Sequence, residues 1–258
     1  MKKHQAGFAH VLILVLVLIV VSAVGFALWR VTASNDTQTS SLPEEVSSKS
    51  PKIKHLGINL DYFDATTGKA GDITFTKLPA VEGGLEAPFL EYGRFVPESS
   101  AGPARRNPQP TFVAPLGTKV YAIADGEVVN VTKLYSNDYS VHVQANGSDI
   151  VFETEHVINV VVKAGDRVSA GQEIAEVSDY DARNLGGLGL FEIGVLVPGN
   201  PPSHVCTFDY LDESIKDETL KKISALQDSW EKYIGSDSIY DQASAPIAGC
   251  ASRDAVEG

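Results

Sequence analysis

The order of hydrophobic and polar positions divides the chain into segments of different kinds. Residues 8–29 form an apolar run whose strongly polar side chains are limited to His10 and Ser22. At 1.5 Å per residue this run is long enough to cross a bilayer. Residues 31–52 are rich in Ser and Thr and carry almost no large apolar side chains, so they predict a flexible linker. We therefore expect residues 1–30 to be a transmembrane anchor that this linker connects to a folded part.

The charges around the apolar run predict its orientation. Lys2 and Lys3 precede it with no acidic residue nearby, and positive flanks favour the cytoplasmic side. We expect a single-pass protein of the cell membrane, with a cytoplasmic N-terminus and an extracytoplasmic remainder. A cleaved signal peptide is the alternative, because residues 21–23 (Val-Ser-Ala) resemble a small-residue cleavage site. The run stays apolar through Trp29, which favours the anchor.

After the linker the pattern becomes that of a folded domain. Residues 53–110 contain two strand-like runs around a turn rich in Gly and Asp, then a stretch rich in proline, and predict a β-hairpin and an irregular extension. Between residues 111 and 211, short runs of alternating apolar residues separated by glycines predict an all-β barrel or sandwich. Residues 212–235 place apolar residues three and four apart, which predicts an amphipathic helix docked on the barrel. Residues 236–258 predict a tail.

Composition excludes several classes of function. The chain has 258 residues, of which 43% are hydrophobic and 21% charged, as in an ordinary globular protein. Its 21 basic and 33 acidic residues leave a net charge of −12, and no basic stretch could follow a phosphate backbone, so no nucleic acid partner is expected. Cys206 and Cys250 lack the spacing of a metal finger. We expect them to form a disulfide, because export places them where thiols oxidise.

Four blocks of the β-rich region carry a family resemblance: APLGTKVYAIADGEVV (Ala114–Val129), FETEHVINVVVKAGDRVSAGQEIAEV (Phe152–Val177), LGLFEIGV (Leu188–Val195) and FDYL (Phe208–Leu211). In this order they resemble the lysostaphin-type (LytM-type) zinc endopeptidases, which cut peptidoglycan cross-bridges. The resemblance implies that residues 111–211 form an antiparallel barrel-sandwich hybrid, a fold akin to biotinyl/lipoyl domains. It also implies a role at the cell wall.

The zinc ligands of that family are missing. The family uses the His and Asp of an H-x-x-x-D segment and the second His of an H-x-H that precedes Phe-Glu. The resemblance places these ligands on Asn107, Thr111 and Leu190, with Leu188 at the first His of the H-x-H. None of these is among the usual protein ligands of zinc, so we expect no cofactor and no catalysis by zinc. His156 remains where the family has a histidine that polarises the attacked carbonyl, and is a relic catalytic candidate.

The remaining polar residues predict a binding groove made of Glu155, His156, Glu192 and His204. One alternative is a rearranged metal site in which His156, Glu192 and His204 hold zinc, and the protein is then an active metalloendopeptidase. The plainer interpretation, which we favour, makes Glu155 and Glu192 hydrogen-bonded residues at the barrel rim, His142 a surface residue and His204 the cap of a loop.

A second alternative is a biotinyl/lipoyl-like adaptor module. Such a module attaches its cofactor to an exposed hairpin lysine, and no lysine lies between Lys163 and Lys216. The sequence therefore favours a membrane-anchored, extracytoplasmic envelope protein with a degenerate, non-catalytic peptidoglycan-endopeptidase domain. We expect it to bind peptidoglycan or to regulate a cell-wall hydrolase.

Overall fold

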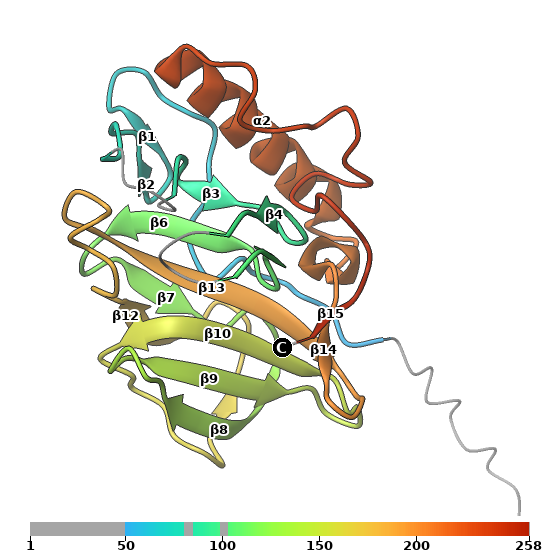
Figure 1. Ribbon diagram of the computed structural model, residues 1–258. Helices are drawn as coiled ribbons and strands as arrows, with labels where there is room; N and C mark the ends of the chain where they lie inside the picture. The colour runs from blue at the N-terminus through green and yellow to red at the C-terminus, as the bar shows by residue number, and fades with distance from the viewer. Residues whose placement is uncertain (1–49, 80–84, 99–102, 258) are drawn as a thin grey trace, which may run out of the picture. The chain divides into compact units, whose positions relative to one another are not determined.

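The computed structural model describes residues 50–79, 85–98 and 103–257. The anchor expected at residues 8–29 and nearly all of the expected linker lie outside these ranges. Among the described residues, no helix combines the length and the apolar character needed to cross a membrane. These residues belong to one compact unit, which is mostly β-sheet, as the alternating segments predicted (Figure 1).

Most strands join one antiparallel sheet. Its main path runs β11–β8–β9–β10–β13–β14–β15, while β6 pairs with β13 and β3, and β12 pairs with β10 and β7. Two small sheets, β1–β2 and β4–β5, lie in the extension that precedes β6. The strands are β1 (Lys69–Ala70), β2 (Ile73–Thr74), β3 (Phe89–Leu90), β4 (Phe95–Val96), β5 (Arg105–Arg106), β6 (Thr111–Pro115), β7 (Lys119–Tyr121), β8 (Gly126–Lys133), β9 (Tyr139–Gln144), β10 (Val151–Ile158), β11 (Arg167–Val168), β12 (Glu173–Val177), β13 (Leu188–Val197), β14 (Ser203–His204) and β15 (Val256–Glu257).

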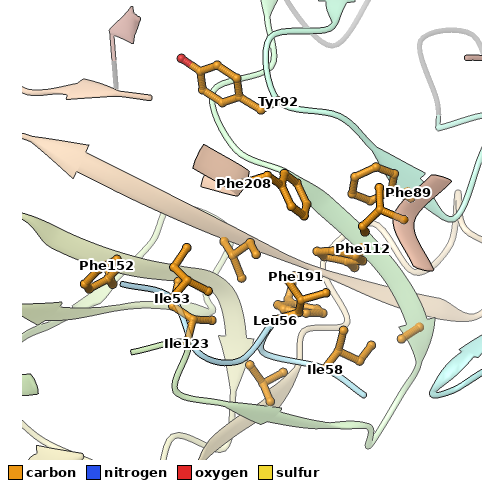
Figure 2. Packing of buried hydrophobic residues seen from close by; sticks show 14 of the residues in the cluster. Ile53, Leu56, Ile58, Phe89, Tyr92, Phe112, Ile123, Phe152, Phe191 and Phe208 are labelled. Atoms are coloured by element: carbon orange, nitrogen blue, oxygen red, sulfur yellow. The ribbon is translucent and has the colours of Figure 1, made fainter. Parts of the chain in front are cut away.

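Alternation along the strands separates a core face from a second face. In β13, Phe191, Ile193 and Val195 are fully buried in the main core, and the residues between them point to the opposite face. The ring of Phe112 on β6 stacks on that of Phe191 with centroids 5.5 Å apart and contacts Phe89 at 5.0 Å. Figure 2 shows the rings of Phe89, Phe112 and Phe191 close together, and they come from the paired strands β3, β6 and β13.

The segment that precedes the hairpin is part of the main core. Ile53, Leu56 and Ile58 are buried there, and Figure 2 places them on a chain segment that passes beside Phe191 and Ile123. Backbone hydrogen bonds from residues 54 and 55 to the carbonyl of Ile123 fix this path. The extension is therefore built into the barrel and is not an appendage.

One helix and one disulfide complete the fold. The helix α2 (Lys216–Ile234) lies within the range predicted for it and ends at Gly235, whose φ of 77° suits a left-handed cap. Its buried Trp230 contacts Phe75 of the extension at 5.4 Å, and Figure 1 shows β1–β3 between the helix and β6. A short 3-10 helix η1 (Thr207–Tyr210) follows Cys206, which forms a disulfide with Cys250.

Candidate functional site

The site lies on the second face of strands β6, β13, β10 and β9, opposite the core. In the register of the sheet, Thr111 on β6 faces Glu192 on β13, and Glu192 faces Glu155 on β10. Because side chains alternate along a strand, Glu153 lies on the same face as Glu155, and His142 on β9 faces Glu153. Four neighbouring strands thus bring acidic residues and histidines together.

At one end of this face, apolar residues occupy the positions where the family resemblance would place the metal. Leu190 is 5% exposed and packs with Leu78, Val113 and Leu185 in a hydrophobic cluster separate from the main core, and Leu188 packs against this cluster. We call these five residues the leucine cluster. Leu78 comes from the extension, so the N-terminal part of the fold helps to close this end of the face.

The two polar residues at the other ligand positions are engaged in hydrogen bonds. Asn107 is buried, and its amide nitrogen donates to the carbonyls of Glu91 and Gln109. Thr111 donates its hydroxyl to Glu192 Oε1 at 2.8 Å. Aliphatic, amide and hydroxyl groups replace the His and Asp donors that zinc requires, so these positions do not fit the metal. Within the described ranges, no three His, Cys, Asp or Glu side chains are placed to hold a metal ion.

Farther along β13, beyond Glu192, a buried carboxylate on β10 gathers four hydrogen-bond donors. Oε1 of Glu153 lies 2.7 Å from both Ser140 Oγ and His142 Nε2, and Oε2 lies 2.9 Å from both Gln109 Nε2 and His204 Nε2. Since a carboxylate only accepts, both histidines must carry their protons on Nε2. We call these five residues the Glu153 network. It joins β9, β10, β14 and the segment before β6.

The Glu153 network determines the ionisation of its members. Burial alone would raise the pKa of Glu153, but the hydrogen bonds from His142 and His204 outweigh it and hold the pKa far below its usual range. The same hydrogen bond to Glu153 raises the pKa of His142. His204 Nδ1 is buried and has no hydrogen-bond partner in the described part of the chain. The Glu153 carboxylate is therefore anionic across the physiological range.

His156 is held by a second, separate set of contacts. It occupies an irregularity of β10 with a φ of 54°, a left-handed conformation that is uncommon for a non-glycine residue. Its Nδ1 lies 2.8 Å from Asp138 Oδ2, and the ring of Tyr180 stacks on its ring at 4.4 Å, with 7° between the planes. Asp138 is 1% exposed and also accepts the hydroxyl of Ser136.

The charges around His156 shift the pKa values of its neighbours. Burial lowers the pKa of His156, but the hydrogen bond to Asp138 and the charge of Glu192 outweigh burial, and the net shift is upward. Burial, with the charges of Glu153 and Glu192, raises the pKa of Glu155 to about 7. Burial also raises the pKa of Glu192. Two carboxyl groups on facing strand positions repel when both are ionised, so this pair retains a proton more readily than isolated glutamates do.

The structure brings the four predicted groove residues to one face in two linked groups. Glu155, His156 and Glu192 interact electrostatically with one another, and His204 joins them through Glu153, whose charge acts on Glu155. Two details differ from our expectation. His142 is not a plain surface residue, because its side chain is 25% exposed and it bonds Glu153. His204 does not cap a loop but lies in β14 and is 5% exposed.

Sequence reasoning missed Glu153, Asp138, Gln109 and Tyr180. Glu153 could have been found, because strand alternation puts it on the face of Glu155. Asp138 and Tyr180 lie in loops outside β9 and β12. The hydrophobic pattern predicts side-chain direction within a strand or a helix but not within a loop. Gln109 stands two residues before β6 and meets Glu153, which is 44 residues away in sequence.

Comparison with known proteins agrees with the resemblance noted in the sequence. Residues 110–193 match the model of Peptidase family M23, a range that runs from the start of β6 into β13 and includes β10. The resemblance of this segment to a lysostaphin-type domain is thereby confirmed. No curated protein sequence matches the chain.

Several solved structures resemble part of the chain. Lysostaphin from Staphylococcus simulans is 22% identical, with 43% of this chain and 43% of that chain covered and a TM-score of 0.36. The catalytic domain of a mutant of the prophage-encoded M23 protein EnpA from Enterococcus faecalis is 20% identical, covering 48% and 92%, with a TM-score of 0.37. A zinc containing peptidase from Vibrio cholerae is 24% identical, covering 50% and 37%, with a TM-score of 0.36. The matched region spans less than half of lysostaphin.

Proposed function

We propose that this protein is a non-catalytic envelope protein whose M23-type domain binds peptidoglycan without cutting it. The family match over residues 110–193 supports a ligand from the cell wall. The observation that carries the non-catalytic part is the leucine cluster, because Leu190 and its neighbours fill the position of an essential zinc ligand with packed aliphatic side chains. Without an activated water, the family's hydrolysis cannot proceed.

The residues that remain suit binding. Glu155 and Glu192 are half-buried side chains on one face of the sheet, and His156 lies beside them with its ring orientation fixed by Asp138 and Tyr180. Recognition in such a groove needs hydrogen bonds and shape complementarity but no metal. The Glu153 network holds His142 and His204 in place, so this part of the site is ordered before a ligand arrives.

The location of the protein is part of the proposal. The apolar run at residues 8–29, with Lys2 and Lys3 before it, supports a membrane anchor that leaves the domain on the outer side of the membrane. Membrane fractionation combined with N-terminal sequencing tests this. A membrane-bound chain that begins at Met1 is expected, and a soluble mature chain that begins near Val24 would contradict the anchor.

The function is tested with the full-length chain in mild detergent and purified, dye-labelled cell walls. We expect the protein to sediment with the walls, to release no dye, and to behave in the same way with and without a chelator. His156→Ala should weaken sedimentation. The matched control is His55→Ala, because His55 contacts Tyr121 and Gly57 and not the groove residues, and it should leave sedimentation unchanged.

Two results would overturn the proposal. Dye release that disappears with a chelator and with His156→Ala or His204→Ala would establish a rearranged metal site and an active endopeptidase. Absence of wall binding, together with specific capture of a purified cell-wall hydrolase that changes the activity of that hydrolase, would assign the domain to regulation of a partner instead.

A further inference from the structure

A tyrosine linked to His156 through Tyr180 is exposed and yet held in a fixed orientation. Tyr135 lies between β8 and β9 and is 84% exposed. Its hydroxyl lies 3.1 Å from that of Tyr180, and the two rings meet edge to face at 87° with centroids 6.2 Å apart. A single exposed aromatic residue needs no explanation, but an exposed ring whose hydroxyl is bonded is partly immobilised before any ligand binds.

The support for Tyr135 continues into the protein interior. Tyr180 stacks on His156, and His156 bonds Asp138, which is buried. Asp138 itself accepts from Ser136, the residue next to Tyr135. The exposed ring therefore belongs to a closed loop of contacts that returns to its own backbone. Tyrosine offers a large contact area at a small cost in side-chain entropy, and a ring that is already fixed loses still less on binding.

Most charged groups of the candidate site have partners, and Asp181 beside Tyr180 accepts a hydrogen bond from Asn184. The Asp138 carboxylate is paired with His156, and the Glu153 carboxylate with His142 and His204. Glu192 accepts the Thr111 hydroxyl, and the pKa of Glu155 near 7 leaves this carboxyl partly protonated at neutral pH. A carboxyl group in this state can both donate and accept hydrogen bonds. Such a groove attracts a strongly charged ligand weakly and suits a neutral ligand rich in hydroxyl and amide groups.

We propose that Tyr135 and Tyr180 form a stacking ledge for a pyranose ring of the glycan strand, with Glu155 and Glu192 bonding its hydroxyl and amide groups. A pyranose presents C–H groups on its ring faces, which pack on an aromatic face, and hydroxyls around its edge, which seek donors and acceptors. The ligand of this part of the groove is thus the sugar backbone of the wall and not a peptide cross-bridge. This assignment rests on the proposed function, since it names which component of peptidoglycan is bound.

The test is a titration of the full-length chain with a soluble N-acetylglucosamine oligosaccharide, followed by calorimetry. Tyr135→Ala should weaken binding about three- to tenfold, the range that corresponds to losing one aromatic contact. Tyr135→Phe keeps the ring and removes the bond to Tyr180, so it should fall between Tyr135→Ala and the wild type. The matched control is Tyr62→Ala, at a tyrosine 46% exposed that contacts Lys222 of α2, and it should bind like the wild type.

The outcomes separate this inference from the function on which it rests. In one outcome the wild type sediments with whole walls, but Tyr135→Ala binds the oligosaccharide as tightly as the wild type does. This would overturn the ledge and leave the proposed function standing. If neither the wild type nor any variant sediments with the walls, the proposed function itself is overturned. In a third outcome the oligosaccharide does not bind, whereas a cross-bridge peptide binds and Tyr135→Ala weakens its binding. This would assign the ledge to a peptide and refute its assignment to a sugar.

Discussion

Replacing Glu153 by glutamine tests whether the Glu153 network holds the site together. The amide has one acceptor oxygen and one donor nitrogen, so two of the four donors around residue 153 must then face another donor. The nitrogen should turn toward Ser140 and His142, because the hydroxyl of Ser140 can rotate and His142, 25% exposed on its side chain, can move its proton to Nδ1. His204 cannot adapt in this way, since its Nδ1 is buried and no described residue offers it a hydrogen bond.

The size of the effect follows from the loss of charge. Hydrogen bonds to a charged group contribute about 1.5–3 kcal/mol each, and two imidazole donors lose such a partner in the variant. Rearrangement at His142 recovers part of this. We therefore expect Glu153→Gln to lower the free energy of unfolding by about 2–4 kcal/mol at pH 7, toward the lower end of what breaking a buried ion pair costs.

The effect should depend on pH in a defined direction. The pKa of Glu153 is lowered from its ordinary value of 4.5 in the folded state, so its contribution is complete above pH 4.5 and is lost as the pH falls below it. The difference between wild type and Glu153→Gln should accordingly shrink between pH 5 and pH 3.

Urea unfolding followed by tryptophan fluorescence measures this difference. Glu127→Gln is the control, because the Glu127 side chain is 47% exposed and lies 3.9 Å from Arg167, so its effect should stay within about 0.5 kcal/mol. A loss below about 1 kcal/mol for Glu153→Gln at pH 7 would refute the reasoning, as would a difference that does not narrow in acid.

Three further predictions concern stability. Glu155→Gln should stabilise the protein at pH 8 but not at pH 4, as measured by urea unfolding at both pH values. The pKa of Glu155 rises from 4.5 to about 7 on folding, so the Glu155 carboxyl lowers the free energy of unfolding of the wild type as the pH rises through this interval. Leu190→Ala should cost about 2–4 kcal/mol in chemical unfolding, since a 5% exposed side chain leaves a cavity in the leucine cluster. Replacing Cys206 and Cys250 together by Ala should cost about 3–4 kcal/mol, from a closed loop of 44 residues; an equal midpoint of thermal unfolding would contradict this.

The β-domain was predictable because its signals are local. The alternation of residues 188–197 and the apolar spacing of residues 216–234 each follow from contacts within one element. The blocks that resemble lysostaphin-type domains indicated the fold type of residues 111–211, which alternation alone does not fix. The path of Ile53 through the core was not predictable. Ile53 pairs with Leu211, more than 150 residues later, and a single apolar residue forms no periodic pattern that would predict such a contact.

The site was predictable only in part, for a related reason. His156, Glu155 and Glu192 were found because they lie inside blocks of recognisable sequence. Their arrangement depends on an irregularity of β10 at His156, which shifts the register between β9 and β10, and on loops that place Asp138 and Tyr180. Sequence reasoning treated His204 as a loop residue because the two-residue strand β14 is too short to show a pattern.

The position of Ile53 determines where a mechanical pull on the chain would act. Ile53 forms a parallel bridge with Leu211, with its N–H bonded to the carbonyl of Tyr210 and its carbonyl to the N–H of Asp212, both at 2.8 Å. A force applied from the N-terminal side strains these two bonds together, in shear, and not one after the other. The segment that receives the force begins at Cys206, which a covalent bond joins to Cys250. Tension applied from the N-terminal side would therefore reach first the part of the domain that a disulfide reinforces.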